Sequence, residues 1–203
     1  MALPQIERNS CGENFGQAQV IAFVDLSDSA TIVAITDTAA KTMATWTAKM
    51  AGASPKIVIS PMLYNPAMNA GGERTWGGGN ATPDGKVFNL GKEPSEFTAE
   101  LRKATAAQQK GLEELTCMAE ADRLGAYLFD GEGQVMGAMK ASAFSPIKVK
   151  KLYVSDIMLM GKEEPDYNSL SMQFEEGWSA DRKVVELSDF RGADLISATI
   201  SQQ

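Results

Sequence analysis

The chain has 203 residues, a hydrophobic content of 44% and no histidine. That hydrophobic content supports a packed core in one sizeable domain and argues against wholesale disorder. The 26 acidic and 19 basic residues leave a net charge of −7, which argues against a surface that coats nucleic acid through clustered Lys and Arg. The missing histidine excludes Ser-His-Asp triads, Cys-His pairs and His-rich metal sites.

The two cysteines and the N-terminal residues indicate where the chain is made. Cys11 and Cys117 lie far apart in the sequence, which is typical of free thiols in a reducing compartment. The first residues show no basic start followed by an apolar stretch, so no signal peptide is expected. No apolar run approaches the roughly 20 residues that span a bilayer. We therefore expect a soluble protein, made in the cytoplasm, without a membrane partner.

The N-terminal quarter of the chain predicts an arm, a hairpin and a helix. Residues 1–18 are polar and contain glycine, as expected of an arm. Residues 19–24 and 31–36 are rich in β-branched side chains and are separated by turn formers, which predicts a β-hairpin. The Ala-rich segment 37–50 predicts a short helix that stops before Gly52 and Pro55, and 56–61 predicts a strand.

The composition changes sharply at residues 65–85, which are rich in Gly, Asn and Thr. Such a segment buries little and predicts a long exposed loop or a loose hairpin, of the kind that is often functional. Residues 86–90 then predict a strand, and alternating apolar side chains predict a second strand that ends at Arg102. Residues 105–121 show helical spacing of apolar side chains, with Thr105 as the N-cap.

The region from Leu124 to Leu187 predicts a series of strands separated by turn residues, which we interpret as a β-meander. The fold class expected for the chain is α+β and mainly β, an antiparallel sandwich or barrel with one main flanking helix. No linker divides the chain, so residues 1–203 are expected to form one domain that ends in a C-terminal arm, 191–203. The expected strands of the meander are 124–129, 134–139, 146–154, 169–174 and 184–187.

Two glycine-rich segments were tested for ligand-binding motifs. The segment from Gly79 to Val87 approaches a phosphate-binding loop, but its spacing is too long and Pro83 removes a backbone donor. The segment that begins at Asp130 lacks the glycine and the closing acid of a calcium-binding EF-hand loop. Both segments are better explained as hairpin turns.

The remaining polar residues predict no catalytic, cofactor-binding or metal-binding site. Adjacent acids such as Glu113 and Glu114 point in different directions on a regular element, so they form no facing pair. The cysteines are too distant to hold zinc together. The methionines, Met158 and Met160 among them, are expected mainly as core filler. We therefore expect no enzyme activity and no cofactor.

Charge is distributed unevenly along the predicted sheet. Lys148, Lys150 and Lys151 lie in a short segment without an acid, whereas the stretch from Gly161 to Glu176 is strongly acidic. Strands of opposite charge suit pairing between copies of the chain in a ring. The same pattern also fits two solvated faces of one sheet, and the sequence leaves both interpretations open.

The C-terminal half resembles phage tail tube proteins, the major tail proteins. The similarity lies in the segments Leu124–Gly137, Pro146–Val154, Glu164–Asn168 and Ser171–Ser179. It covers roughly half of the chain, and the motifs are structural. The resemblance implies a β-sandwich or barrel with a flanking helix, in a subunit without catalytic residues.

The resemblance also implies a function in the virion. Tail tube subunits assemble as rings, commonly hexamers, that stack into a conduit through which DNA is ejected. Inter-ring contacts come from long loops and arms, for which 65–85, 1–18 and 191–203 are the candidates. The implied partners are further copies, the tape measure and the tail terminator, while DNA passes without specific binding. A net negative charge suits such a lumen, because like charges repel.

Other functions remain open on the sequence alone. A neck, tail-terminator or capsid-associated protein is built from similar β-rich domains. A carbohydrate- or peptide-binding module that uses Trp76 and the Gly-rich segment is a rival from outside the virion. An enzyme is the weakest alternative, because only carboxylates, Ser, Lys and Tyr remain to act.

Overall fold

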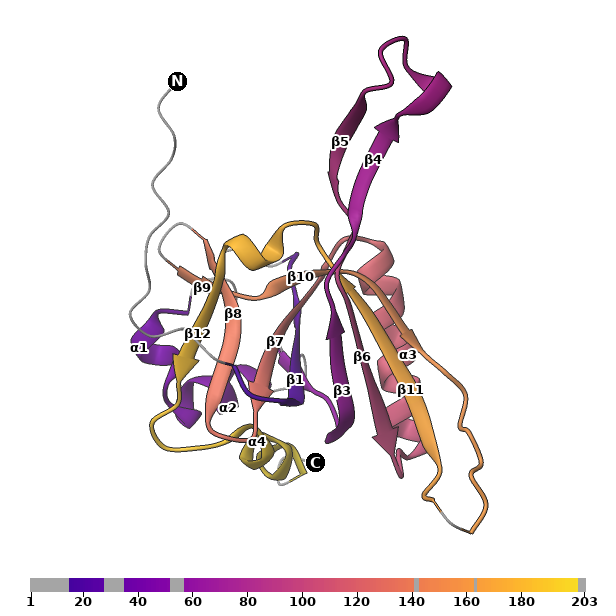
Figure 1. The fold of residues 1–203 in the computed structure, drawn as a ribbon. Coiled ribbons are helices and arrows are strands. Elements are labelled where there is room, and N and C mark those ends of the chain that lie inside the picture. The colour runs from indigo at the N-terminus through magenta and orange to yellow at the C-terminus, as the bar shows by residue number, and fades with distance from the viewer. Residues whose placement is uncertain (1–14, 28–34, 52–56, 141–142, 163, 201–203) are drawn as a thin grey trace.

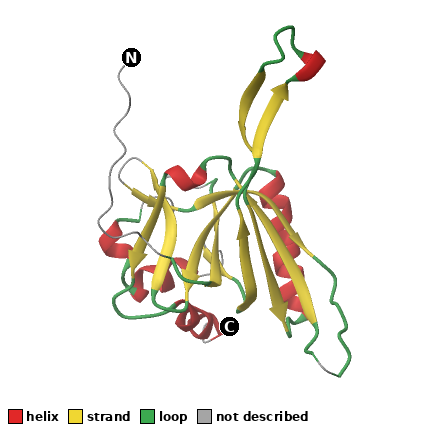
Figure 2. Cartoon of the chain, in the orientation of Figure 1, coloured by secondary structure: helices red, strands yellow, loops and turns green. Residues whose placement is uncertain are grey.

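The computed structural model describes residues 15–27, 35–51, 57–140, 143–162 and 164–200. Antiparallel strands dominate these residues and helices pack on them, which confirms the predicted α+β, mainly β class (Figure 2). The strands are β1 (Ala18–Asp25), β2 (Ile57–Ile59), β3 (Leu63–Asn69), β4 (Glu73–Gly77), β5 (Val87–Lys92), β6 (Glu96–Arg102), β7 (Leu124–Asp130), β8 (Gln134–Lys140), β9 (Ala143–Ser145), β10 (Ile147–Val154), β11 (Tyr167–Phe174) and β12 (Arg182–Glu186). The α-helices are α1 (Asp37–Ala40), α2 (Met43–Met50), α3 (Ala106–Glu120) and α4 (Gly192–Ile200).

Strand β7 lies at the centre of a ten-stranded sheet (Figure 1). One edge of β7 pairs along its whole length with β1, which also pairs with β2. The other edge is shared, because β10 pairs with the first part of β7 and β8 with the last part. From there the sheet continues through β11, β6 and β3 on one side and through β12 on the other. Strands β4 and β5 pair only with each other, in a separate two-stranded sheet.

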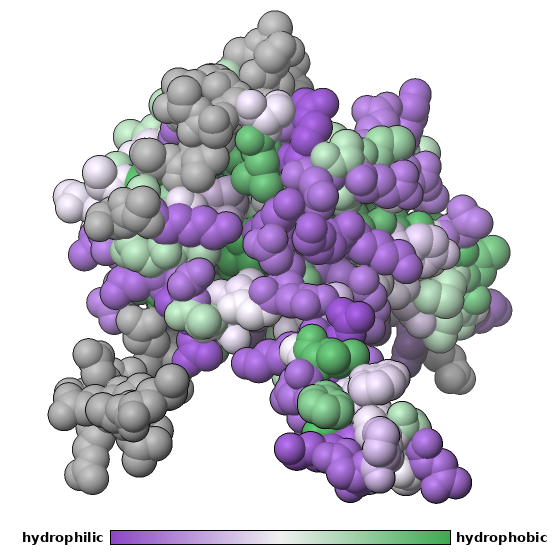
Figure 3. Space-filling model, turned by 90° about the horizontal axis from the view of Figure 1, so that it is seen from above, coloured by the Kyte–Doolittle hydropathy of each residue, from purple (hydrophilic) through white to green (hydrophobic). Residues whose placement is uncertain are grey.

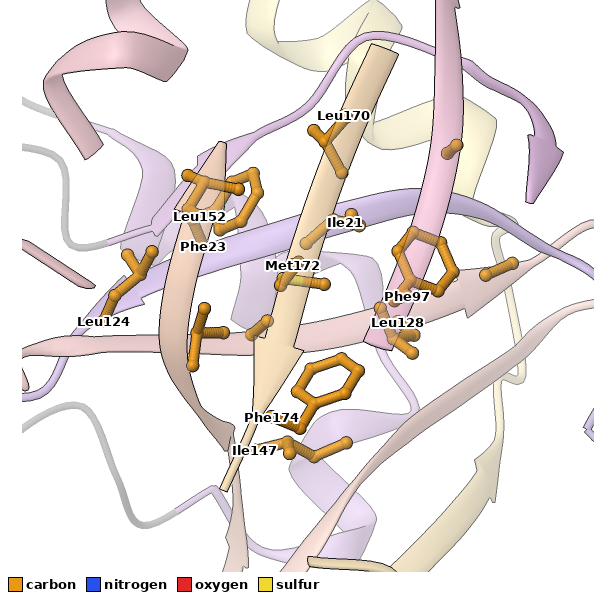
Figure 4. Close-up of a cluster of buried hydrophobic side chains, with 14 of the residues drawn as sticks. Ile21, Phe23, Phe97, Leu124, Leu128, Ile147, Leu152, Leu170, Met172 and Phe174 are labelled. Carbon is orange, nitrogen blue, oxygen red and sulfur yellow. The ribbon is translucent and has the colours of Figure 1, made fainter. Parts of the chain in front are cut away.

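The central strands are apolar on both faces because each face supports a separate core. Every residue of β7 is buried, from Leu124 to Asp130. Its Leu124 and Leu128 face a core formed with β1, β3, β6, β10 and β11, in which Phe97 and Phe174 also lie (Figure 4). Tyr127 and Phe129 of the same strand face a second core under the helices α1, α2 and α4. Burial on both faces explains why the sequence of β7 does not alternate between apolar and polar residues.

The second core is built around aromatic rings. Trp46 of α2 is completely buried and lies edge-on to Tyr127 and Phe129, with ring centroids 5.1 and 4.9 Å apart. Its Nε1 donates a hydrogen bond to the Ala40 carbonyl at 2.9 Å. The Tyr127 hydroxyl donates to the Phe144 carbonyl, and burial raises the pKa of this tyrosine. Each buried polar tip therefore has a partner, as a stable aromatic core requires.

Helix α3 confirms the strongest helix prediction. It begins after Thr105, whose hydroxyl accepts a hydrogen bond from the Gln108 amide, while the Gln108 side chain accepts one from the Thr105 amide. This reciprocal pair is a capping box. The helix packs mainly on β10 and contributes Leu112 and Ala119 to the first core.

Two predicted strand pairings are wrong. The predicted meander from 124 to 187 would place successive strands side by side, but β10 pairs with β7, and β12 returns to pair with β8. The predicted hairpin of 19–24 with 31–36 also fails, because β2 and β7 occupy the two edges of β1. Residues 31–34 lie outside the described residues, and Ile35 bridges instead to Phe144.

Three other predicted segments take a more specific form than expected. The helix over 37–50 is divided into α1 and α2, because Thr42 between them has extended backbone angles. The segment 65–85 is divided between β3 in the main sheet and a hairpin built on β4 and β5. Most of the segment 191–203 forms α4, whose Leu195 is completely buried. Residues 1–14 of the predicted N-terminal arm lie outside the described residues.

Candidate assembly surfaces

The hairpin of β4 and β5 projects from one end of the molecule (Figure 1). Trp76 and Phe88 lie opposite each other across its two strands, with ring centroids 5.9 Å apart. Their exposed fractions are 56% and 46%, and Val87 and Leu90 are exposed at 59% each. Figure 3, which looks down on this end, shows hydrophobic side chains on the hairpin. An isolated two-stranded hairpin is only marginally stable in water, so this one is suited to contact with a partner.

Glycines allow the hairpin to turn at its tip and to leave the sheet at its base. Gly77 has φ of +103°, and a Cβ atom there would lie 2.4 Å from the Lys86 carbonyl oxygen. At the base, a Cβ atom on Gly71 would lie 1.7 Å from the Glu93 carbonyl oxygen. A larger residue at either position therefore requires the backbone to move. Asp84 accepts a hydrogen bond from the Lys86 amide, which confirms the predicted turn in place of a phosphate loop.

The base of the hairpin is attached to the body of the protein. The Glu93 amide donates a hydrogen bond to the Gly72 carbonyl at 2.8 Å. Arg74 forms an ion pair with Glu176, with 3.2 Å between Nη1 and Oε1. These contacts orient the hairpin relative to the sheet, although the ion pair is half exposed and contributes little stability by itself.

The connection between β10 and β11 presents a second exposed apolar segment. Ile157, Met158, Leu159 and Met160, here called the apolar loop, are exposed at 48, 37, 77 and 41%. Met158 forms a β-bridge with Tyr167, and the Met160 amide donates to the Asp166 carboxylate at 2.9 Å. These two contacts support the loop while its apolar side chains lie in solvent. Its run of apolar residues was visible in the sequence. The methionines were expected mainly as core filler, which holds for the buried Met136 and Met172, whereas Met158 and Met160 are exceptions.

An apolar groove lies between α3, β2 and α4 and has a volume of about 470 Å³. Val58, Ile59 and Pro61 line one side, and Leu112 and Leu115 of α3 line the other. Gly111 leaves the wall of α3 open, because a Cβ atom at that position would meet no atom within 4 Å. The rest of the lining is Ser60, Thr105, Ala107, Gln108 and Ile196. No feature of the sequence had indicated this groove, because its walls come from three separate segments.

The strands at the two ends of the main sheet path, β3 and β12, differ in how they are protected. In β3 the register shifts between Tyr64 and Ala67, and Pro66 lies within the strand. A proline and an irregularity on an outer strand disfavour the addition of another strand. Strand β12 at the opposite end of the sheet path is short but has no proline. Of these two strands, β12 is therefore the better one for pairing with a neighbouring chain.

Two of the three lysines of the predicted lysine-rich strand share one carboxylate within the chain. Lys150 and Lys148 of β10 both approach the Asp122 carboxylate, at 2.9 and 3.3 Å. The hydrogen bond from Lys150, followed by that from Lys148, lowers the pKa of Asp122. The neighbouring strand is β11 of the same chain. These contacts favour the interpretation that both strands form solvated faces of one sheet.

The described residues contain no group of three or more Asp, Glu, Cys or His side chains that is arranged to hold a metal ion. Asp130 accepts hydrogen bonds from the Glu132 and Gln134 amides, which confirms the predicted turn. Glu113 and Glu114 are exposed on α3, and Cys117 is an exposed thiol. Within the described part of the chain, no helix is both long enough and apolar enough to cross a membrane.

A solved structure is similar to this chain over most of its length, at low sequence identity. No family model matches the chain, and no curated protein matches it. Among solved structures, the chain is similar to a chain of the anti-feeding prophage (AFP) baseplate, determined by cryo-EM and 6-fold symmetrised, with 8% sequence identity and a TM-score of 0.34. The match covers 93% of this chain and 99% of the other. A TM-score this low is not a basis for assigning a function.

Proposed function

We propose that this chain is a structural protein of a phage-type tail, and more specifically a tube subunit that assembles into stacked rings. The observation that carries the proposal is the placement of two projecting elements at opposite ends of the molecule (Figure 1). The hairpin extends from one end of the strand pair β3–β6, and the apolar loop extends near the other end. A subunit with such ends can contact different neighbours above and below itself, as a tube requires.

Burial and chemistry support an assembly function over catalysis. The described residues place large hydrophobic side chains in solvent at both projecting elements, which is costly unless partners cover them. The resemblance of the C-terminal half to tail tube proteins supports the same function. We propose accordingly that the chain has no enzyme activity, that its main partner is another copy of itself, and that its destination is the virion.

The proposal is tested by the assembly state of the purified full-length chain. Negative-stain images and mass photometry over a range of concentrations should show rings and short tubes. A strictly monomeric protein at the highest concentration would contradict the proposal.

A hairpin variant separates assembly from folding. Replacing Glu73–Lys92 by two glycines removes the hairpin while retaining β3, and the bond between Gly72 and Glu93 shows that the ends are close enough to join. Thermal unfolding followed by circular dichroism should remain cooperative, as expected of an intact main sheet, and tubes should be lost. Tubes that persist without the hairpin would show that it does not connect the subunits.

A further inference from the structure

The hairpin and the apolar groove lie at opposite ends of the same pair of strands. At one end of the β3–β6 pair, Asn69 is opposite Glu96, next to the base of the hairpin. At the other end, Leu63 is opposite Leu101, close in sequence to Pro61 and Thr105, which line the groove. Strand β3 has 7 residues, so the two features are separated by roughly 20 Å along the strand.

We infer that the groove receives the Trp76–Phe88 ring pair of a second copy of this chain. This inference rests on the proposed function, and it names the contact by which one subunit stacks on the next. A projecting apolar element at one end and an apolar recess at the other make a heterologous contact. Because its two halves lie at opposite ends of the β3–β6 pair, the contact is expected to repeat along an axis and not to close into a ring. A single chain thus carries both halves of the contact.

The size and polarity of the two surfaces match. A groove of about 470 Å³ is roughly three times the ~150 Å³ cavity that is known to hold benzene, so it has room for an indole and a phenyl ring. The described residues that line it are apolar or neutral, and Thr75 and Asn89, next to the ring pair in sequence, are also neutral. Arg74 and Lys86, two positions from the rings along the chain, are exposed, and their long side chains can keep their charges in solvent at the rim of the groove. Insertion therefore removes apolar surface from water without burying an unpaired charge.

The contact made by one subunit is small. A ring presents it once for each of its subunits. Two aromatic side chains bury of the order of 300–500 Å² together, less than the ~800 Å² per partner of a standard stable interface. Repetition of the contact around a ring strengthens it by effective concentration. Single chains are accordingly expected to stack weakly, and rings to stack strongly.

The sharpest test fills the groove without disturbing the fold. Gly111→Leu places a side chain into the open wall of α3, where an added Cβ atom meets nothing within 4 Å, and leucine is a better helix former than glycine. The matched control is Lys110→Leu, which makes the neighbouring exposed residue of α3 apolar outside the groove lining. Sedimentation and negative-stain images then measure the concentration at which stacks appear.

The groove variant and a Trp76→Ala/Phe88→Ala double variant should each raise the stacking concentration by at least about tenfold. Both should still form single rings, and Lys110→Leu should stack like the unmodified chain. Stacking of Gly111→Leu at the unmodified concentration would overturn the inference.

Mixing the two defective variants gives an independent readout. Rings of Gly111→Leu retain the ring pair, and rings of the double variant retain the groove, so a mixture should form paired rings that grow no further. A mixture that forms long stacks, or no pairs at all, would contradict a contact between these two surfaces. If both variants form tubes like the unmodified chain, other surfaces connect the rings, and only the inference about the groove is overturned. If the unmodified chain never assembles, the proposed function is overturned as well.

Discussion

Asn168 of β11 donates a hydrogen bond from Nδ2 to the Gln109 side-chain oxygen of α3 at 3.2 Å. The same amide nitrogen donates to the Ser155 carbonyl at 2.9 Å, although Asn168 is only 1% exposed. One buried side chain therefore connects α3, which lines the groove, to Ser155, two residues before the apolar loop. A buried amide with both donors used is costly to remove, because its partners lose their hydrogen bonds as well.

Asn168→Ala should lower the free energy of unfolding by about 1–3 kcal/mol, because the Ser155 carbonyl is left without this donor in a buried setting. Urea denaturation followed by circular dichroism measures the change. Gln109→Ala, which removes the more exposed partner, serves as the control and should cost less. If both variants lost the same free energy of unfolding, the buried Asn168 amide would contribute no more than its exposed partner.

Thr105→Ala should destabilise the protein by about 0.5–2 kcal/mol, because it removes the N-cap oxygen of α3 and breaks the reciprocal pair with Gln108. Thr105→Ser keeps the hydroxyl and should retain most of the stability. Thermal denaturation of the two variants beside the unmodified chain makes the comparison. If the serine variant were as unstable as the alanine variant, the methyl group of Thr105, and not its hydrogen bond, would account for the lost stability.

Glu100 should contribute to the loss of stability in acid. Asn65 Nδ2 donates to its Oε1 at 2.9 Å, and Arg102 Nη2 lies 3.0 Å from its Oε2, and these contacts lower the pKa of Glu100. A carboxylate with a lowered pKa in the folded state stabilises the protein above its ordinary value of 4.5. This stabilisation is lost as the pH falls through the folded pKa.

Glu100→Gln should therefore lose less stability than the unmodified chain between about pH 5 and about pH 3, as measured by urea denaturation. Glu114→Gln, on the exposed surface of α3, is the control and should follow the unmodified chain. An unchanged acid response of the Glu100 variant would exclude a contribution from this residue.

Two glycines with opposite surroundings should respond oppositely to alanine. Gly111→Ala should stabilise the protein by up to about 1 kcal/mol, because alanine favours the interior of a helix and the added methyl group meets open space. Gly137→Ala should cost about 1–3 kcal/mol, because its Cβ atom would lie 2.7 Å from the Ser145 carbonyl oxygen and 2.8 Å from the Phe144 ring. Midpoints of thermal unfolding provide the measurement, and two shifts of the same sign would contradict the packing argument.

Much of the local structure could be predicted from the sequence. The cap at Thr105 and the helical spacing after it predict α3. β-branched residues predict β1, alternating apolar residues predict β6, and apolar runs bounded by turn formers predict β2 and β7, each within a few residues. These elements depend on interactions between residues close in sequence, such as a hydroxyl and an amide three positions apart. The strand partners could not be predicted, because an alternating pattern shows which face is buried and does not show which strand lies beside it.

The assembly surfaces were likewise predictable from the sequence only in part. The sequence by itself determined that a Gly-rich segment with an exposed Trp76 interrupts the β pattern, and that no histidine chemistry is available, because residue type and local turn preference suffice for both. Only the tertiary structure decided that Trp76 faces Phe88 on a projecting hairpin and that a groove lies beyond the opposite end of β3. The groove is formed by the packing of three separate segments. The pattern of apolar residues along the sequence does not specify which distant segments contact each other.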